Sequence, residues 1–228
     1  MLNTTPAIIL AGGFGTRLSS VVKDVPKPMA PINGKPFLHY LFKELREQNI
    51  PRVVLSVGHL KEVIQEYFKD NYLGIPIQYA IEDTPLGTGG GIKHAFEFIQ
   101  DDAYVLNGDT FFDVSLHRLK NEKADISIAL KHLYHFDRYG TVELNDKNKI
   151  IAFHEKKPCE SGLINGGIYY FKKSLFDKIE TEKKFSFEKD VLEKHLHDLS
   201  MQGVVFDNYF IDIGIPEDYN KAQKDFHK

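Results

Sequence analysis

Residues 10–18 have the sequence LAGGFGTRL, and they directly follow a short apolar run, residues 7–10, that is typical of a buried strand. Glycine lets the backbone approach a ligand closely, so Gly12, Gly13 and Gly15 can direct consecutive N–H groups at an anion. Arg17 adds the fixed fork of guanidinium donors that suits a phosphate. The stretch therefore predicts a turn after the first strand that holds the phosphates of a nucleotide.

Two better-known phosphate-binding motifs do not fit this stretch. A Walker A loop requires a Lys-Ser or Lys-Thr pair to close the turn, but here Arg17 stands five residues after Gly12 and no such pair follows. The dinucleotide-binding fingerprint requires a third glycine three residues after the second, where this chain has Leu18. The nucleotide site is therefore of another kind.

Beyond the loop, the first half of the chain alternates helical and strand patterns. Three prolines at 26, 28 and 31 exclude a helix around Lys27 and hold this lysine on a stiff loop. Apolar spacing predicts helices over 37–45, over 60–68 with Tyr67 on the inner face, and over 92–99 after a glycine-rich segment at 87–91. Apolar runs predict strands at 52–57, 75–81 and 103–106. These units predict an α/β fold whose sheet begins parallel.

The second half of the chain contains more strand. Alternating apolar residues predict strands at 126–130, 142–144 and 150–153, and another strand follows at 204–206. Helical spacing predicts helices at 175–179 and 191–196, and Pro216 suits the first turn of a closing helix. We expect this half to form part of the sheet and a lid.

Asp109 follows the predicted central strand at 103–106. In open α/β sheets, ligands bind at the carboxyl ends of the strands, so Asp109 is well placed for a metal. A lone aspartate in a turn is usually a cap or a turn former, and the other motifs of the chain must support a metal-binding role.

Together with the glycine-rich loop, Pro26-Lys27-Pro28-Met29 resembles the opening signature of the sugar-1-phosphate nucleotidyltransferases. This family transfers a nucleoside monophosphate from a nucleoside triphosphate to a sugar 1-phosphate. The segments N-G-D at 107–109, E-K at 155–156, N-G-G at 165–167 and D-I-G-I-P-E-D-Y at 212–219 resemble further family elements in the family's order, with Ile215 replacing the usual threonine. The resemblance implies a Rossmann-like, three-layer α/β nucleotidyltransferase fold with a mostly parallel mixed central sheet.

The resemblance also implies the organisation of the chain and of its site. We expect one nucleotidyltransferase domain over 1–228, with residues 1–120 mainly nucleotide-binding, residues 121–228 mainly sugar-phosphate-binding, and no C-terminal β-helix domain. The implied nucleotide-binding residues are Leu10, Ala11, Gly12, Gly13, Gly15, Thr16, Arg17, Lys27, Glu82, Pro85, Gly87, Thr88, Asn107 and Gly108. The implied sugar-phosphate-binding residues are Gly140, Glu155, Lys156, Asn165 and Gly166.

The implied catalytic groups are charged. They are Arg17, Lys27, Asp109, Lys156 and Asp212, and the cofactor is Mg²⁺ held by Asp109 and Asp212. Whether Lys156 or the adjacent Lys157 faces the site is open, because strand alternation places Lys156 opposite Glu155 unless a bulge intervenes.

Three segments point to the substrates. The sequences P-K-P-M-A-P-I, P-L-G-T-G-G and L-N-G-D-T-F-F are most similar to the family members that transfer GMP from GTP to D-glycero-α-D-manno-heptose 1-phosphate for bacterial surface polysaccharides. The alternatives are uridylyl, thymidylyl, cytidylyl or guanylyl transfer to N-acetylmuramate, mannose or glucose 1-phosphate. A non-catalytic regulatory module is the alternative of another class, although such modules tend to lose the charged residues that this chain retains.

The composition narrows the possible partners. A net charge of −3 gives no support to nucleic-acid binding, and the single cysteine, Cys159, fits a reducing compartment. The N-terminus lacks the pattern of a signal peptide, and no apolar stretch is long enough to span a membrane. We therefore expect a cytoplasmic protein with no nucleic-acid or membrane partner, and a homodimer is possible.

Overall fold

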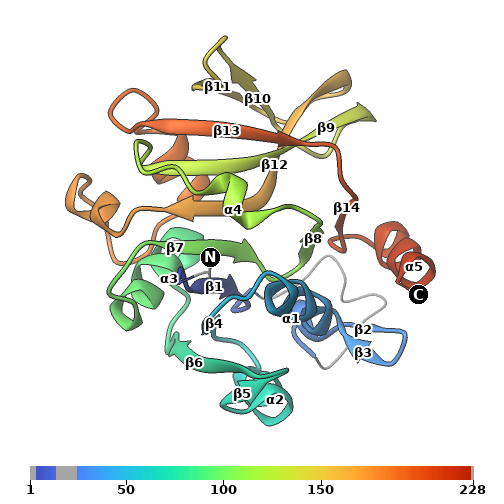
Figure 1. Cartoon of the computed structure of the whole chain (residues 1–228). Coiled ribbons are helices and arrows are strands. Elements are labelled where there is room, and N and C mark those ends of the chain that lie inside the picture. Colours follow the sequence, from blue (N-terminus) through green and yellow to red (C-terminus); the bar gives the residue numbers. More distant parts are fainter. Residues whose placement is uncertain (1–3, 14–24, 227–228) are drawn as a thin grey trace.

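The computed structural model describes residues 4–13 and 25–226, and its central feature is a parallel set of strands (Figure 1). These strands are β1 (Ala7–Leu10), β4 (Val53–Val57), β6 (Ile75–Ile81) and β7 (Ala103–Asn107), in the order β7-β1-β4-β6. The short strand β5 (Asn71–Tyr72) pairs with β6 in the antiparallel direction. β1 and β4 are almost wholly buried, as expected for parallel strands that are covered on both faces.

Strands from the second half of the chain extend this sheet and lie above the parallel strands in Figure 1. The long strand β12 (Cys159–Phe171) pairs antiparallel with β7, with β9 (Ile126–Phe136) and with β10 (Thr141–Leu144). β11 (Ile150–His154) pairs with β10, and β13 (Met201–Phe206) runs parallel to β9. The predicted α/β fold with a mixed sheet that begins parallel is therefore confirmed.

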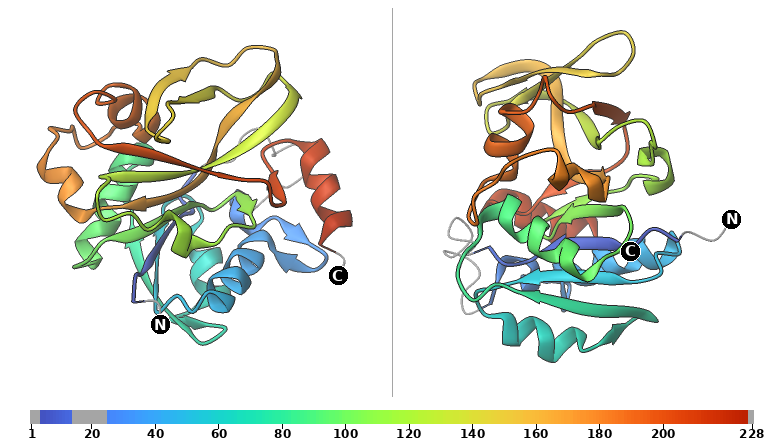
Figure 2. Two further views of the ribbon diagram at one scale, coloured as in Figure 1. Left: turned by 45° about the horizontal axis from the view of Figure 1, so that its top comes forward. Right: turned by 90° about the vertical axis from the view of Figure 1, so that its left-hand side faces the viewer.

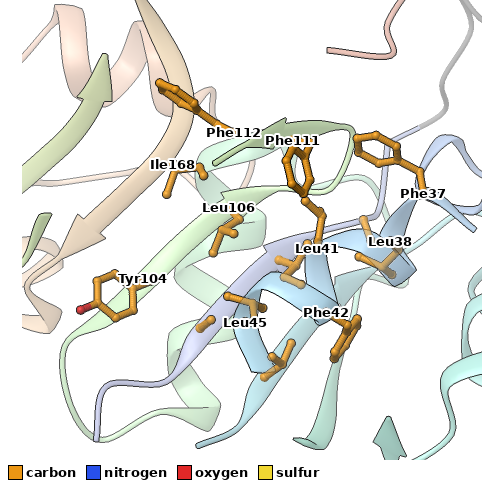
Figure 3. Packing of buried hydrophobic residues seen from close by; sticks show 14 of the residues in the cluster. Phe37, Leu38, Leu41, Phe42, Leu45, Tyr104, Leu106, Phe111, Phe112 and Ile168 are labelled. Carbon is orange, nitrogen blue, oxygen red and sulfur yellow. The ribbon is translucent and has the colours of Figure 1, made fainter. Parts of the chain in front are cut away.

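Two hydrophobic cores lie on opposite faces of the sheet. Ile9 of β1 faces the core that contains α1 (Phe37–Glu47), and its neighbour Ile8 faces the core that contains α3 (Gly87–Ala95). Figure 3 shows the buried face of α1 against the sheet, and Figure 2 shows the layers from two further directions. The alternation of side chains along one strand thus produces the predicted three layers.

Several helices differ from the sequence-based predictions. The helix predicted at 175–179 is a 3₁₀-helix, η3 (Lys173–Asp177), and the helix predicted at 191–196 is a π-helix, η4 (Glu188–Glu193). The buried side chains are Leu175 in η3 and Val191 and Leu192 in η4. In α2 (Lys61–Phe68), Ile64 and Phe68 are buried, but Tyr67 is exposed rather than on the inner face.

The glycine-rich segment forms part of a helix instead of preceding it. α3 begins at Gly87, and a Cβ atom at Gly89 would lie only 2.2 Å from the ring of Phe185. The glycines therefore let the helix approach the segment around Phe185 closely. A 3₁₀-helix, η2 (Phe96–Phe98), directly follows α3, whereas the sequence predicted an α-helix that extends to residue 99.

Short elements complete the structure. The proline-rich segment forms one 3₁₀ turn, η1 (Lys27–Met29), and not the helix-free loop that was predicted. The hairpin of β2 (Pro31–Ile32) and β3 (Lys35–Pro36) and the helix α4 (Leu116–Leu119) were not predicted. The closing helix α5 (Pro216–Asp225) begins at Pro216, as predicted. Among the described residues, the structure contains no helix of the length and apolarity that crossing a bilayer requires.

A small two-stranded ladder positions the polar residues of the site. β8 (Thr110–Phe112) follows Asn107, and β14 (Phe210–Asp212) comes just before α5. The two strands pair antiparallel so that Thr110 is opposite Asp212. The ladder therefore brings the N-G-D turn and the D-I-G segment together, although they are about a hundred positions apart in the sequence.

Candidate active site

The carboxyl ends of β1, β4 and β7 border a cavity of about 390 Å³. This is the edge of an open α/β sheet at which ligands are expected. The predicted nucleotide-binding residues that line it are Leu10, Gly12, Gly13, Lys27, Glu82, Pro85, Gly87, Thr88, Asn107 and Gly108. Ala11 is buried and does not line the cavity, while Gly15, Thr16 and Arg17 lie outside the described residues. We refer to this cavity as the first pocket.

The carboxylate of Glu82 is fixed in the wall of the first pocket. Its Oε1 accepts a hydrogen bond from Ser56 Oγ at 3.0 Å, and its Oε2 accepts one from the Leu86 N–H at 2.9 Å. A Cβ atom at Gly12 would lie 3.1 Å from Oε1, and one at Gly91 would lie 2.8 Å from it. Because a carboxylate oxygen can accept more than one hydrogen bond, Glu82 keeps acceptor capacity for a ligand.

A second pocket of about 500 Å³ adjoins the first and shares Lys27, Asn107, Asp109 and Glu188 with it. All the predicted sugar-phosphate-binding residues line it, namely Gly140, Glu155, Lys156, Asn165 and Gly166. Lys157 does not. Glu155 and Lys156 face the same pocket because β11 ends at His154, so the expected strand alternation no longer applies to them.

Asn165 is held by its own neighbours. Its Oδ1 accepts a hydrogen bond from the Gly167 N–H at 3.0 Å, and its Nδ2 donates to Tyr169 Oη at 2.9 Å. Gly167 has a φ of +72°, and a side chain there would also collide with Asn107. The amide of Asn165 is therefore pre-oriented, with one N–H left to offer to a ligand.

Lys27 lies between two carboxylates where the pockets meet. Its Nζ is 2.6 Å from Asp109 Oδ2 and 4.0 Å from Asp212 Oδ1. Asp212 Oδ1 also accepts a hydrogen bond from the Gly214 N–H at 2.7 Å. Burial raises the pKa of Asp212, the negative charge of Asp109 raises it further, and Lys27 opposes both effects. An additional cation would therefore be favourable beside this pair.

The two carboxylates fit the requirements of a Mg²⁺ ion. Asp109 and Asp212 present oxygen donors at the edge of a pocket, and Mg²⁺ is commonly held by one or two carboxylates with phosphates and waters. In the parts of the chain that the structure describes, no cluster of three or more His, Cys, Asp or Glu side chains offers a complete protein cage.

Sequence reasoning missed several lining residues of the second pocket. Arg138 and Tyr139 come from the turn between β9 and β10, and Arg138 Nη2 lies 2.5 Å from Asp218 Oδ2 of α5. Ser186 and Glu188 come from the segment before and within η4, and both precede the helix that was predicted at 191–196. The D-R-Y-G sequence next to Gly140 could have indicated Arg138, because a charged residue there adjoins a predicted site glycine.

The fold, with two adjoining pockets at the carboxyl ends of its parallel strands, is that of an α/β protein of the class that binds its ligands at this edge of the sheet. This class matches the family comparison, because the family model described as Nucleotidyl transferase covers residues 6–228. The chain belongs to the nucleotidyl transferase family.

Close relatives within this family are heptose-phosphate guanylyltransferases. The chain is 54% identical to the D-glycero-alpha-D-manno-heptose 1-phosphate guanylyltransferase of Campylobacter jejuni, over 93% of this chain and 96% of that protein. It is 50% identical to the enzyme of the same name from Aneurinibacillus thermoaerophilus, over 96% and 97% of the two chains. The crystal structure of HddC from Yersinia pseudotuberculosis complexed with GMP-PN is similar, with a TM-score of 0.88, 37% identity, and coverage of 98% of this chain and 100% of that chain.

Proposed function

We propose that this protein transfers GMP from GTP to D-glycero-α-D-manno-heptose 1-phosphate and releases pyrophosphate. The observation that carries the proposal is the pair of adjoining pockets that share Lys27 and Asp109. They occur in a chain that is 54% identical to a guanylyltransferase of this name over nearly the whole length of both proteins. Two pockets that meet at charged groups suit a reaction in which two phosphate-bearing substrates must come together.

The chemistry requires charge compensation more than proton transfer. A phosphate monoester has a second pKa of about 6, so the attacking oxygen of the sugar phosphate is already ionised at neutral pH. No general base is needed. The main obstacle is the repulsion between two anions, which cationic groups at the meeting point reduce.

Lys27 and Lys156 supply positive charge to the two substrates. Lys27 lines both pockets, where it contacts the triphosphate, and Lys156 lines the second pocket, where it binds the incoming sugar phosphate. Asp109 and Asp212 would hold Mg²⁺, which would supply further charge neutralisation and alignment of the phosphates. Arg17, in the glycine-rich loop, is proposed to assist at the triphosphate.

Glu82 supports guanine as the base. Guanine presents the N1–H and the N2 amino group as adjacent donors, and a carboxylate in the pocket wall can accept from both. Uracil and thymine present two carbonyl acceptors beside one N–H, which a carboxylate would repel. The fixed carboxylate of Glu82 in the first pocket therefore favours GTP over UTP or dTTP.

The direct test is product identification. The protein is incubated with GTP, the heptose 1-phosphate and Mg²⁺, and the product is examined by mass spectrometry and ³¹P NMR. The proposal predicts GDP-heptose and pyrophosphate, and both must disappear when Asp109→Asn replaces the unmodified protein. Binding of GTP without any product would instead support the non-catalytic regulatory module.

The domain organisation, the location and the oligomeric state of the protein are also proposals. We propose one domain with the two halves at 1–120 and 121–228, and a cytoplasmic enzyme with its single Cys159 reduced. A homodimer stays a prediction, which sedimentation equilibrium can decide.

A further inference from the structure

Glu188 occupies a position that the proposed chemistry does not use. It lines both pockets, as do Lys27, Asn107 and Asp109, which already have proposed roles. It is half-buried and begins η4, the π-helical segment. A negatively charged side chain at the meeting point of two phosphate-bearing substrates requires an explanation, because it would repel both phosphates.

Two hydroxyl groups hold the Glu188 side chain by one of its oxygens. Thr88 Oγ1 donates to Glu188 Oε2 at 2.8 Å, and Ser186 Oγ donates to the same oxygen at 2.9 Å. Thr88 Oγ1 itself accepts from the Phe187 N–H at 2.8 Å, which fixes its orientation. Within the described part of the chain, the other oxygen, Oε1, makes no hydrogen bond. The carboxylate is thus fixed in place, and its Oε1 can still accept a hydrogen bond from a ligand.

Among the described residues, Glu188 takes neither of the two usual roles of such a carboxylate. Over residues 4–13 and 25–226, no Lys, Arg or His side chain forms an ion pair with Glu188. Over the same residues, it does not join Asp109 and Asp212 in a cluster of metal ligands. A fixed acceptor beside two sugar-bearing substrates suits a hydroxyl donor.

We propose that Glu188 recognises substrate hydroxyl groups, with Oε1 accepting hydrogen bonds from a sugar where the two pockets meet. This inference rests on the proposed function, because that function supplies the two possible sources of hydroxyl groups. One source is the ribose of the nucleotide in the first pocket, and the other is the sugar phosphate in the second. Thr88 and Ser186 act as positioning residues for the carboxylate.

The test compares Glu188→Gln with Glu182→Gln. Glu182 is an exposed glutamate shortly before η4, and it lines neither pocket. Because hydrogen bonds to charged acceptors are stronger than those to neutral ones, E188Q is expected to raise one KM about tenfold with little change in kcat. Glu182→Gln should leave both KM values unchanged. Melting temperatures of the variants show whether folding is preserved.

Substrate analogues distinguish the two sources. If the ribose is recognised, E188Q raises the KM for GTP, and the penalty shrinks with 2′-deoxy-GTP or 3′-deoxy-GTP. If the sugar phosphate is recognised, E188Q raises the KM for the heptose 1-phosphate and the penalty is the same with every nucleotide. Either pattern supports the inference, whereas KM values equal to those of the unmodified protein for both substrates overturn it.

Calorimetric binding separates this inference from the proposed function. GTP and the heptose 1-phosphate are titrated separately into the unmodified protein and into E188Q. Weaker binding of either ligand to E188Q supports the role of Glu188 even if no turnover is seen, which would contradict only the proposed function. Equal dissociation constants, or no binding of either ligand to the unmodified protein, overturn the inference.

Discussion

The ammonium group of Lys27 lies 2.6 Å from the carboxylate of Asp109, although the two residues are 82 positions apart in the sequence. The stiff turn η1 fixes the lysine, and the carboxyl end of β7 fixes the aspartate. The ladder of β8 and β14 adds Asp212 to the same group. The charged centre thus depends on three segments that meet only in the folded sheet.

The Asp212→Asn variant should separate stability from activity. Because burial and Asp109 raise the pKa of Asp212, the ionised carboxylate lowers the free energy of unfolding at neutral pH. The amide removes this cost and can still accept from the Gly214 N–H. We expect an unchanged or higher melting temperature, while loss of a preorganised charge should lower kcat about 100-fold or more.

The matched control for this variant is Asp113→Asn. Asp113 is an exposed carboxylate just after β8 and lines neither pocket. Its removal should leave turnover unaltered. Full turnover in Asp212→Asn would show that Asp212 has no part in phosphate or metal binding.

Glu82→Gln should weaken the preference for guanine. The amide can offer only one acceptor oxygen to the N1–H and N2 amino groups of the base, so kcat/KM for GTP should fall about tenfold or more. Asp83→Asn is the control, because Asp83 is adjacent, exposed and outside the first pocket. Steady-state kinetics with GTP and UTP provide the measurement, and an unchanged ratio of the two kcat/KM values would contradict base recognition by Glu82.

Lys156→Ala and Lys157→Ala should differ in their effects on the sugar phosphate. Lys156 lines the second pocket and Lys157 does not. A lost charge-assisted contact to a phosphate should raise the KM for the heptose 1-phosphate by about 10- to 100-fold in Lys156→Ala. Lys157→Ala should behave like the unmodified protein. The opposite result would place Lys157 at the site.

Asp125 should make the fold sensitive to acid. Burial alone would raise the pKa of this carboxyl group, but hydrogen bonds from Lys178 Nζ (2.6 Å) and the Ser200 N–H (3.0 Å) hold the pKa below its usual value of 3.8. Its stabilising contribution is therefore complete above pH 3.8 and is lost as the pH falls through the lowered pKa. Asp125→Asn should lower the free energy of unfolding at pH 7 by about 1–2 kcal/mol.

Urea unfolding of both proteins at neutral and acidic pH provides the check for Asp125. The stability difference between unmodified protein and Asp125→Asn should shrink as the pH falls. A difference that stays constant down to acid pH would mean that the carboxylate has no lowered pKa in the folded state.

Much of the fold follows from local patterns in the sequence. The buried strands β1 and β4 were predicted from continuous apolar runs, and the amphipathic helix α1 was predicted from the helical spacing of its apolar residues. The segments η3 and η4 were mistaken for α-helices because their apolar spacing is helical over a few residues only. Their geometry depends on packing against the sheet, which spacing does not reveal.

Some pocket residues could likewise be predicted from local sequence motifs, whereas others depend on contacts that form only in the folded chain. Glycines and charged residues in short motifs, such as Gly12 and Asp109, could be assigned to a site because their chemistry is local. Glu188 could not, because its position depends on contacts with Thr88, a hundred residues earlier in the chain. Likewise, Glu155 and Lys156 line the same pocket because β11 ends at His154.

Pyrophosphate release tests the central claim most directly. GTP, UTP, CTP, dTTP and ATP are each combined with heptose, mannose, glucose and N-acetylmuramate 1-phosphates in the presence of Mg²⁺. The account predicts release with GTP and D-glycero-α-D-manno-heptose 1-phosphate in clear preference to every other pair. Preferential release with a different nucleotide or sugar phosphate, or no release with any pair, would contradict it.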